Sequence, residues 1–174
     1  SSIFSLMTYR ILFVSKFTMR WWNTYFPLTK LANKSVIYNY VNISKTVKRK
    51  KPNKLNVGFV GRLEKEKGIH TFTNITKNIT NPCVKFHIFG EGSIKLNKKY
   101  LKKIKIYKWT KRDQIYKKIN ILFVTSEIEN CPLNVLEAKS YGIPTITISN
   151  GGIKEIIQNN KDGFILGKNT SYVK

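Results

Sequence analysis

The pattern of apolar and polar positions changes near residue 53. From there on, short runs of β-branched and aromatic residues alternate with segments of helical length, which is typical of parallel βαβ units. We therefore expect an α/β fold in which a Rossmann-like parallel sheet of about six strands carries helices on both faces. The expected strands are Leu55–Val60, Val84–Phe89, Ile104–Tyr107, Ile121–Val124, Thr145–Ile148 and Gly163–Leu166. The expected helices lie near Ile69–Ile79, Lys95–Lys103, Lys111–Lys118, Leu133–Tyr141 and Ile153–Asn159.

The first 52 residues do not follow this pattern. An apolar start is followed by the aromatic cluster Trp21–Phe26 and later by Lys45–Lys54, a run with six cations and no acid that is typical of a solvated linker. The aromatic cluster could form a membrane-interface belt, but we favour packing on this domain or on another one. The longest apolar stretch, Ile3–Val14, is too short for a membrane-spanning helix of about 20 residues, and no signal peptide is expected.

The chain is strongly basic. It has 32 Lys and Arg against 9 Asp and Glu among 174 residues, yet its 41% hydrophobic content excludes a disordered chain. The net charge of +23 favours anionic partners, namely phosphorylated small molecules, an anionic membrane surface or nucleic acid. A general bias toward Lys, Asn and Ile would explain the charge equally well. Because no RRM, KH or helix-turn-helix signature is present, we expect no nucleic acid, and a basic nucleic-acid-binding module is kept as the alternative class.

The cysteines and histidines give no sign of a metal site. Cys83 and Cys131 are far apart and form no CxxC pair, so neither a disulfide framework nor a zinc site is expected, and a reducing cytoplasm fits best. His70 and His87 are isolated in the sequence, and we expect both to be structural.

Residues suited to ligand binding follow the first two predicted strands. In open parallel sheets, ligands bind beyond the carboxyl ends of the strands. The loop Gly61–Gly68 follows the first strand, and its Arg62 and Lys67 offer positive charge to a diphosphate, although such a loop could also be plain solvated surface. Gly90-Glu91-Gly92 follows the second strand, and its glycines could admit a flat base. Neither the full G-x-G-x-x-G fingerprint nor a P-loop is present.

Two carboxylates frame the segment after the fourth predicted strand. Glu129 and Glu137 lie eight residues apart, across a loop and the first turns of a helix. Asn130 could cap this helix and Pro132 suits its first turn, where free N–H groups form an anion site. Because carboxylates accept hydrogen bonds from sugar hydroxyls, a glycosyl group and a ribose are natural partners. The alternative is that Glu129 caps the helix and Glu137 faces solvent.

Taken together and in this order, the motifs resemble the carboxyl-terminal domain of GT-B glycosyltransferases, most closely glycosyltransferase family 4 (group 1). The resemblance covers residues 36 to 167, and departs from the common family pattern at Asn39–Asn42 and at Ala138-Lys139-Ser140, which are not donor residues. The matching pieces are Val36–Asn39, Gly58–Leu63 with Lys67-Gly68, Ile88–Gly92, the E-x7-E segment Glu129–Glu137, Gly142-Ile143-Pro144, and Gly151-Gly152 with Glu155-Ile156-Ile157 and Gly163.

The resemblance implies retaining transfer of a sugar from a nucleotide-diphosphate sugar, without a cofactor or an obligatory metal. The catalytic residues would be Glu129, Arg62 and Lys67, with Glu129 acting by positioning or electrostatics and the two cations stabilising the leaving diphosphate. The donor phosphates would be bound by Gly61, Arg62, Lys67 and the backbone around Asn130, Cys131, Pro132 and Leu133. The base would lie beside Gly90, Glu91 and Gly92. Glu129 would contact the sugar and Glu137 the ribose.

The resemblance also implies how the chain is divided. Residues 1–35 would be the tail of an amino-terminal acceptor domain, 36–54 a connecting segment and basic linker, and 55–174 a nucleotide-sugar-binding domain. We expect this chain alone to bind donor and hardly turn over. The whole enzyme would use a glycan or lipid-linked acceptor in surface polysaccharide, lipopolysaccharide or glycolipid synthesis, in the cytoplasm or peripherally on the inner face of the membrane. A truncated, non-catalytic remnant is the other alternative.

Overall fold

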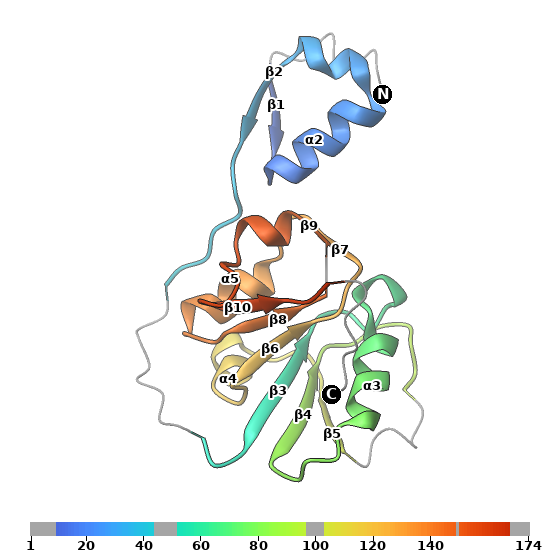
Figure 1. Cartoon of the computed structure of the whole chain (residues 1–174), viewed down its shortest axis with the longest axis vertical. Coiled ribbons are helices and arrows are strands. Elements are labelled where there is room, and N and C mark those ends of the chain that lie inside the picture. The colour runs from blue at the N-terminus through green and yellow to red at the C-terminus, as the bar shows by residue number, and fades with distance from the viewer. Residues whose placement is uncertain (1–9, 44–51, 97–102, 149, 168–174) are drawn as a thin grey trace.

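A six-stranded parallel sheet forms the centre of the molecule (Figure 1). The computed structural model describes residues 10–43, 52–96, 103–148 and 150–167. The strand order is β10-β8-β6-β3-β4-β5, and every pairing within it is parallel. The strands are β3 (Leu55–Val60), β4 (Val84–Phe89), β5 (Ile104–Tyr107), β6 (Ile121–Val124), β8 (Thr145–Thr147) and β10 (Gly163–Ile165). The predicted sheet is therefore confirmed, with β8 and β10 each one residue shorter than expected.

Helices pack on both faces of this sheet, as predicted. One face is covered by α3 (Ile69–Asn78), whose fully buried Phe72 lies among the rings of Phe59, Phe86 and Phe123. Burying one such side chain contributes roughly 1.5–3 kcal/mol. The other face is covered by α4 (Arg112–Tyr116) and α5 (Leu133–Ser140), where the rings of Tyr116 and Tyr141 stack with centroids 5.3 Å apart (Figure 1).

One of the five predicted helices is wrong, and another lies mostly outside the described residues. In place of Ile153–Asn159 there is only the 3₁₀ helix η4 (Gly152–Glu155). The helix stops because the Gln158 N–H donates to the Asp162 carboxylate at 2.7 Å, in the turn that leads into β10. In the predicted helix Lys95–Lys103, the described residues Lys95, Leu96 and Lys103 are not helical, and 97–102 lie outside the described residues.

Residues 10–36 form a small β-α-β unit that the sequence pattern did not predict. The strands β1 (Arg10–Phe13) and β2 (Asn33–Val36) pair in parallel and are connected by α2 (Lys16–Tyr25) and the 3₁₀ helix η1 (Pro27–Leu31). Helix α2 begins after Ser15, whose hydroxyl accepts the Thr18 N–H at 3.1 Å. The unit lies beyond the carboxyl ends of the central strands (Figure 1).

A two-stranded sheet lies between this unit and the central sheet. It consists of β7 (Ile128–Glu129) and β9 (Asn150–Gly151), which pair in parallel. Separately, none of the helices in the described residues is long and apolar enough to cross a membrane.

Candidate functional site

The carboxyl edge of the sheet carries a partly buried ion pair between two of the predicted site residues. Lys67 follows β3, Ser126 follows β6, and Glu129 lies in β7. The Lys67 Nζ and the Ser126 Oγ each lie 2.8 Å from the Glu129 Oε1 and donate to it. The Glu129 side chain is only 10% exposed and that of Lys67 31%. The carboxylate therefore does not cap a helix; it forms a shielded cluster with two donors from neighbouring loops.

The main chain around Glu129 is held by the close approach of a glycine. Gly151 in β9 has φ 98°, and a Cβ there would come within 2.6 Å of the Glu129 carbonyl oxygen. At this φ, glycine is the residue that folds without strain. The Gly151-Gly152 motif thus has a structural reason, which is to bring the chain after β8 against the carboxylate segment.

Glu137 is directed toward the inside of the helical layer. Its Oε2 accepts a hydrogen bond from the Tyr116 hydroxyl at 2.7 Å, and the same hydroxyl lies 3.1 Å from the Asn134 carbonyl oxygen. Burial, together with the negative charge of Glu137, raises the pKa of Tyr116 far above its usual range, so this phenol stays protonated and remains a donor. The alternative of a fully solvent-facing Glu137 is wrong, because the side chain is half-buried and oriented by a buried tyrosine.

Arg62 is not part of the Glu129 cluster. Its guanidinium pairs instead with Glu66 at 3.1 Å, and the two side chains are 64% and 59% exposed. An exposed pair of this kind contributes little, about 0–1 kcal/mol, so Arg62 can leave it readily for another anion. Of the two predicted phosphate ligands, only Lys67 lies at the carboxylate in this structure.

The glycines of Gly90-Glu91-Gly92 are explained by loop packing. A Cβ at Gly90, where φ is 147°, would come within 2.0 Å of the Gly61 carbonyl oxygen, and one at Gly92 within 2.5 Å of the Leu63 carbonyl oxygen. A hydrogen bond of 3.0 Å from the Leu63 N–H to the Glu91 carbonyl oxygen closes the contact. The missing side chains thus let two predicted donor loops meet. Glu91 itself is exposed, 4.0 Å from Lys108.

The start of α5 differs in detail from the prediction. The residue that precedes the helix is Pro132, in an extended conformation with no side-chain cap, whereas Asn130 was expected to cap and Pro132 to stand in the first turn. Pro132 itself is extended, and just before it the Cys131 carbonyl oxygen accepts a hydrogen bond from the Asn39 side-chain amide at 2.7 Å. Burial raises the pKa of the Cys131 thiol, so it is a poor nucleophile.

Both cysteines lie in the described part of the chain. Cys83 is exposed and Cys131 is buried, and both are free. Within the described residues, no group of three or more His, Cys, Asp or Glu side chains is placed to hold a metal ion.

Glu155 is a residue whose role the sequence did not predict. Its carboxylate accepts the main-chain N–H groups of Lys16 and Phe17, at 2.9 and 2.7 Å, and the Tyr38 hydroxyl at 2.7 Å. Burial alone would raise the pKa of Glu155, but these hydrogen bonds and the nearby charge of Arg20 outweigh it and lower the pKa. The first turn of α2 is therefore docked, through a carboxylate, onto the segment that follows Gly151-Gly152.

Most of the chain matches a known protein family. The family described as glycosyl transferases group 1 matches residues 42–172. The chain belongs to this family. Two similar proteins are the glycogen synthase of Petrotoga mobilis, 28% identical over 138 residues (74% of this chain, 28% of that protein), and the amylovoran biosynthesis glycosyltransferase AmsD of Erwinia amylovora, 30% identical over 118 residues (62% and 32%). The chain thus spans less than half the length of these relatives.

The fold is shared with solved glycosyltransferase structures. A mutant of S. aureus TarM, in complex with fondaparinux, α-GlcNAc-glycerol and UDP, superposes with a TM-score of 0.81 at 19% identity. The superposition covers 95% of this chain and 35% of TarM. The six-stranded domain therefore has the Rossmann-like form found in GT-B glycosyltransferases.

Proposed function

We propose that this chain is the carboxyl-terminal, donor-binding part of a retaining family 4 glycosyltransferase. The observation that carries the proposal is the shielded cluster of Lys67, Ser126 and Glu129 at the carboxyl edge of the sheet, beside the point where the strand order reverses between β3 and β6. Ligands of open parallel sheets bind at such a point. A cation and a carboxylate held together suit a donor that carries both phosphate and sugar hydroxyls.

In the proposed reaction, the bond between the anomeric carbon of the sugar and the diphosphate oxygen breaks, and its electron pair leaves with the diphosphate. Lys67, joined by Arg62 once it leaves Glu66, stabilises the charge that develops on this leaving group. The acceptor hydroxyl forms the new bond to the anomeric carbon and passes its proton to the oxygen of the leaving diphosphate. Glu129 would bind hydroxyls of the transferred sugar, acting by position and charge.

The nucleoside would lie on the side of α5. Glu137 has further acceptor capacity beyond the bond from Tyr116, since a carboxylate offers about four lone-pair positions, and it would take the ribose hydroxyls. The contact between the Gly61 and Gly90-Gly92 loops would border the base. The main chain around Asn130, Cys131, Pro132 and Leu133 would meet the phosphates. No metal or other cofactor is proposed.

The acceptor belongs to the proposal as well. TarM was solved with UDP and a GlcNAc-glycerol, and AmsD acts in amylovoran biosynthesis, which supports a nucleotide sugar as donor and a glycan or lipid-linked acceptor in surface polysaccharide, lipopolysaccharide or glycolipid synthesis. We assign acceptor selection to the part of a whole enzyme that this chain does not span. A cytoplasmic location, peripheral on the membrane, fits the net charge of +23.

The proposal is tested by isothermal titration of UDP, GDP and ADP into the chain. One of them should bind, and Lys67→Ala should weaken that binding by about tenfold or more, because a charge-assisted contact is worth about 1.5–3 kcal/mol. Arg62→Ala should have a similar but smaller effect. Lys77→Ala, which removes an exposed charge from α3, is the matched control and should bind as wild type.

The result is read together with thermal unfolding. A nucleotide at 100 times its Kd should add about 2.7 kcal/mol to the free energy of unfolding of wild type. If Lys67→Ala unfolds cooperatively and binds the nucleotide as tightly as wild type, the donor-site assignment is wrong.

A further inference from the structure

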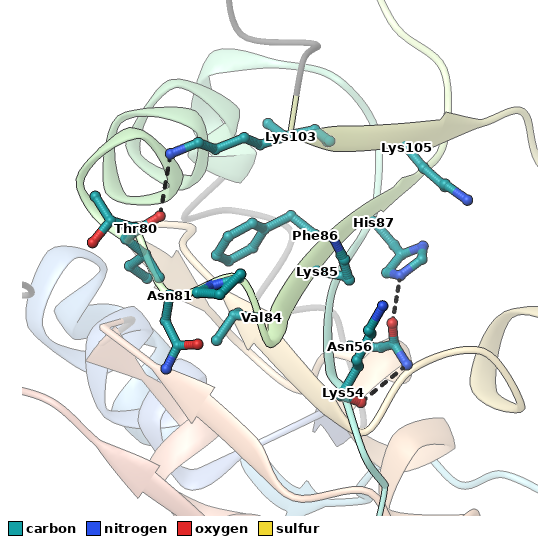
Figure 2. Close-up of a pocket in the computed structure, with 13 residues that line it drawn as sticks. Lys54, Asn56, Thr80, Asn81, Val84, Lys85, Phe86, His87, Lys103 and Lys105 are labelled. Atoms are coloured by element: carbon teal, nitrogen blue, oxygen red, sulfur yellow. Dashed lines mark hydrogen bonds between the residues drawn. The ribbon is translucent and has the colours of Figure 1, made fainter.

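A second pocket lies at the opposite, amino-terminal edge of the central sheet (Figure 2). Its volume is ≈ 770 Å³, and it is formed by the starts of β3, β4 and β5 together with the turn that precedes β4. Four of its lining residues are lysines, and none is acidic: Lys54, Lys85, Lys103 and Lys105. The pocket therefore concentrates positive charge in a concave part of the surface, well away from Glu129.

The strand register places the polar residues of the pocket on one face of the sheet. In the parallel pairing Asn56 lies beside Lys85, and His87 lies beside Lys105. Because side chains alternate along a strand, Lys85 and His87, two residues apart, point to the same face, as do their partners. Among the described residues, no ion pair engages Lys54, Lys85 or Lys105. These ammonium groups thus border an imidazole without a counter-charge.

His87 has an incomplete set of hydrogen bonds. It is only 7% exposed, and its Nε2 lies 3.0 Å from the Asn56 Oδ1 (Figure 2). The amide of Asn56 is oriented by its Nδ2, which donates to the Asn120 Oδ1 at 3.2 Å, so the Oδ1 faces His87 and accepts from Nε2–H. The His87 Nδ1 is buried and has no hydrogen-bond partner within the described part of the chain.

We propose that this pocket binds a ligand through a phosphate group, held by Lys85 and Lys105 beside the His87 ring, as a second site separate from the donor site. A phosphate carries about −1.5 to −2 charges at pH 7 and three acceptor oxygens, which matches ammonium donors that have no carboxylate partner.

His87 makes the binding observable. Burial, with the charges of Lys105 and Lys118, lowers the pKa of His87. Lys54, Lys85 and Lys103 line the same pocket and add positive charge. An anion bound beside Lys105 offsets the effect of that lysine on the ring, so the pKa of His87 should rise when phosphate binds. His70, the other histidine of the chain, is exposed on α3 and serves as an internal reference.

The test is a histidine side-chain NMR titration of the chain with inorganic phosphate at constant ionic strength, set by sodium chloride. We expect a saturable change at His87 and none at His70. The double variant Lys85→Gln/Lys105→Gln should weaken the response by about tenfold or more, while the matched double variant Lys77→Gln/Lys161→Gln should respond as wild type. Lys105→Gln alone is the second variant, should the pair fold poorly.

A second arm identifies the source of the phosphate. Flotation with phosphatidic acid vesicles, compared with phosphatidylcholine vesicles, reports a lipid headgroup if it depends on Lys85 and Lys105. The recessed pocket favours a soluble phosphate ester, for which the NMR arm responds. If neither arm responds, if both histidines respond alike, or if the Lys85/Lys105 variant behaves as wild type, the proposal is overturned. The double variant Arg62→Ala/Lys67→Ala should keep the His87 response. The test of the phosphate pocket is therefore independent of whether the donor-site proposal is right.

Discussion

At the scale of single residues, the predicted motifs contain both residues required by backbone contacts and residues whose side chains meet. Gly90 and Gly92 match a ligand-binding motif, yet each lies where a Cβ would collide with the carbonyl oxygen of a neighbouring loop. Glu129 and Lys67 also match ligand-binding motifs, and their side chains form an ion pair, with the Lys67 Nζ 2.8 Å from the Glu129 Oε1. A motif in the sequence therefore marks residues that hold the loops together as well as residues that would bind the donor.

The glycine contact leads to a prediction about stability. Gly90→Ala should lower the free energy of unfolding by about 1–3 kcal/mol, because it adds a Cβ 2.0 Å from the Gly61 carbonyl oxygen at a φ of 147°. Urea unfolding monitored by circular dichroism measures the change. Gly61→Ala is the control, since its Cβ would make only ordinary contacts, 3.7 Å from the Phe59 ring. If both variants lose the same free energy of unfolding, the collision at Gly90 has no cost and the prediction is wrong.

At the scale of elements, prediction succeeded for the strands that are mostly buried. Strands such as Leu55–Val60 and Val84–Phe89 are rich in β-branched and aromatic residues, their last four residues are buried, and their bounds agree with the structure. The segment Arg10–Phe13 belongs to the apolar stretch Ile3–Val14, and Asn33–Val36 is mostly polar. Both are short and mostly exposed or half-buried, so neither was recognised as a strand. Helix η4 is short because a side-chain contact from Asp162 stops it, and no local propensity reveals such a contact.

The docking of α2 depends on the ionisation of one carboxylate, which leads to a pH prediction. The folded pKa of Glu155 is lowered, so the stabilisation that it provides is complete above its unfolded pKa of about 4.3 and is lost as the pH falls through the folded value. Hydrogen exchange of the Lys16 and Phe17 amides, which donate to this carboxylate, should therefore lose protection only in that acidic range.

A variant separates this contact from general acid destabilisation. Glu155→Gln should expose the same two amides to faster exchange at neutral pH, by about tenfold, because a neutral acceptor binds them less strongly than a carboxylate. Glu66→Gln removes an exposed carboxylate from the pair with Arg62 and should leave these amides protected as in wild type. Unchanged exchange in Glu155→Gln would contradict the proposed docking role.

At the scale of the whole molecule, the sequence located the candidate site but not its internal contacts. The order of strands and polar loops placed Lys67 and Glu129 at one edge of the sheet, because parallel strands all end there. Ser126 and Tyr116, which orient the two carboxylates, were not predicted, since they are joined to them only by the fold. The pocket beside His87 was missed for the same reason, because its lysines lie in or directly before three different strands and each is ordinary when taken alone.

The placement of Glu155 has a mechanical consequence. The first amides of α2 are joined to Glu155 by hydrogen bonds, and from Glu155 the main chain of η4 leads to Gly151, which is paired with Glu129. The Phe17 ring would lie only 3.1 Å from a Cβ at Gly151, so α2 also contacts this path directly. A tilt of α2 would therefore be transmitted over a short distance to the Glu129 carboxylate, which Lys67 contacts. A rigid-body movement of the amino-terminal unit, residues 10–36, would thus change the position of the Glu129 side chain.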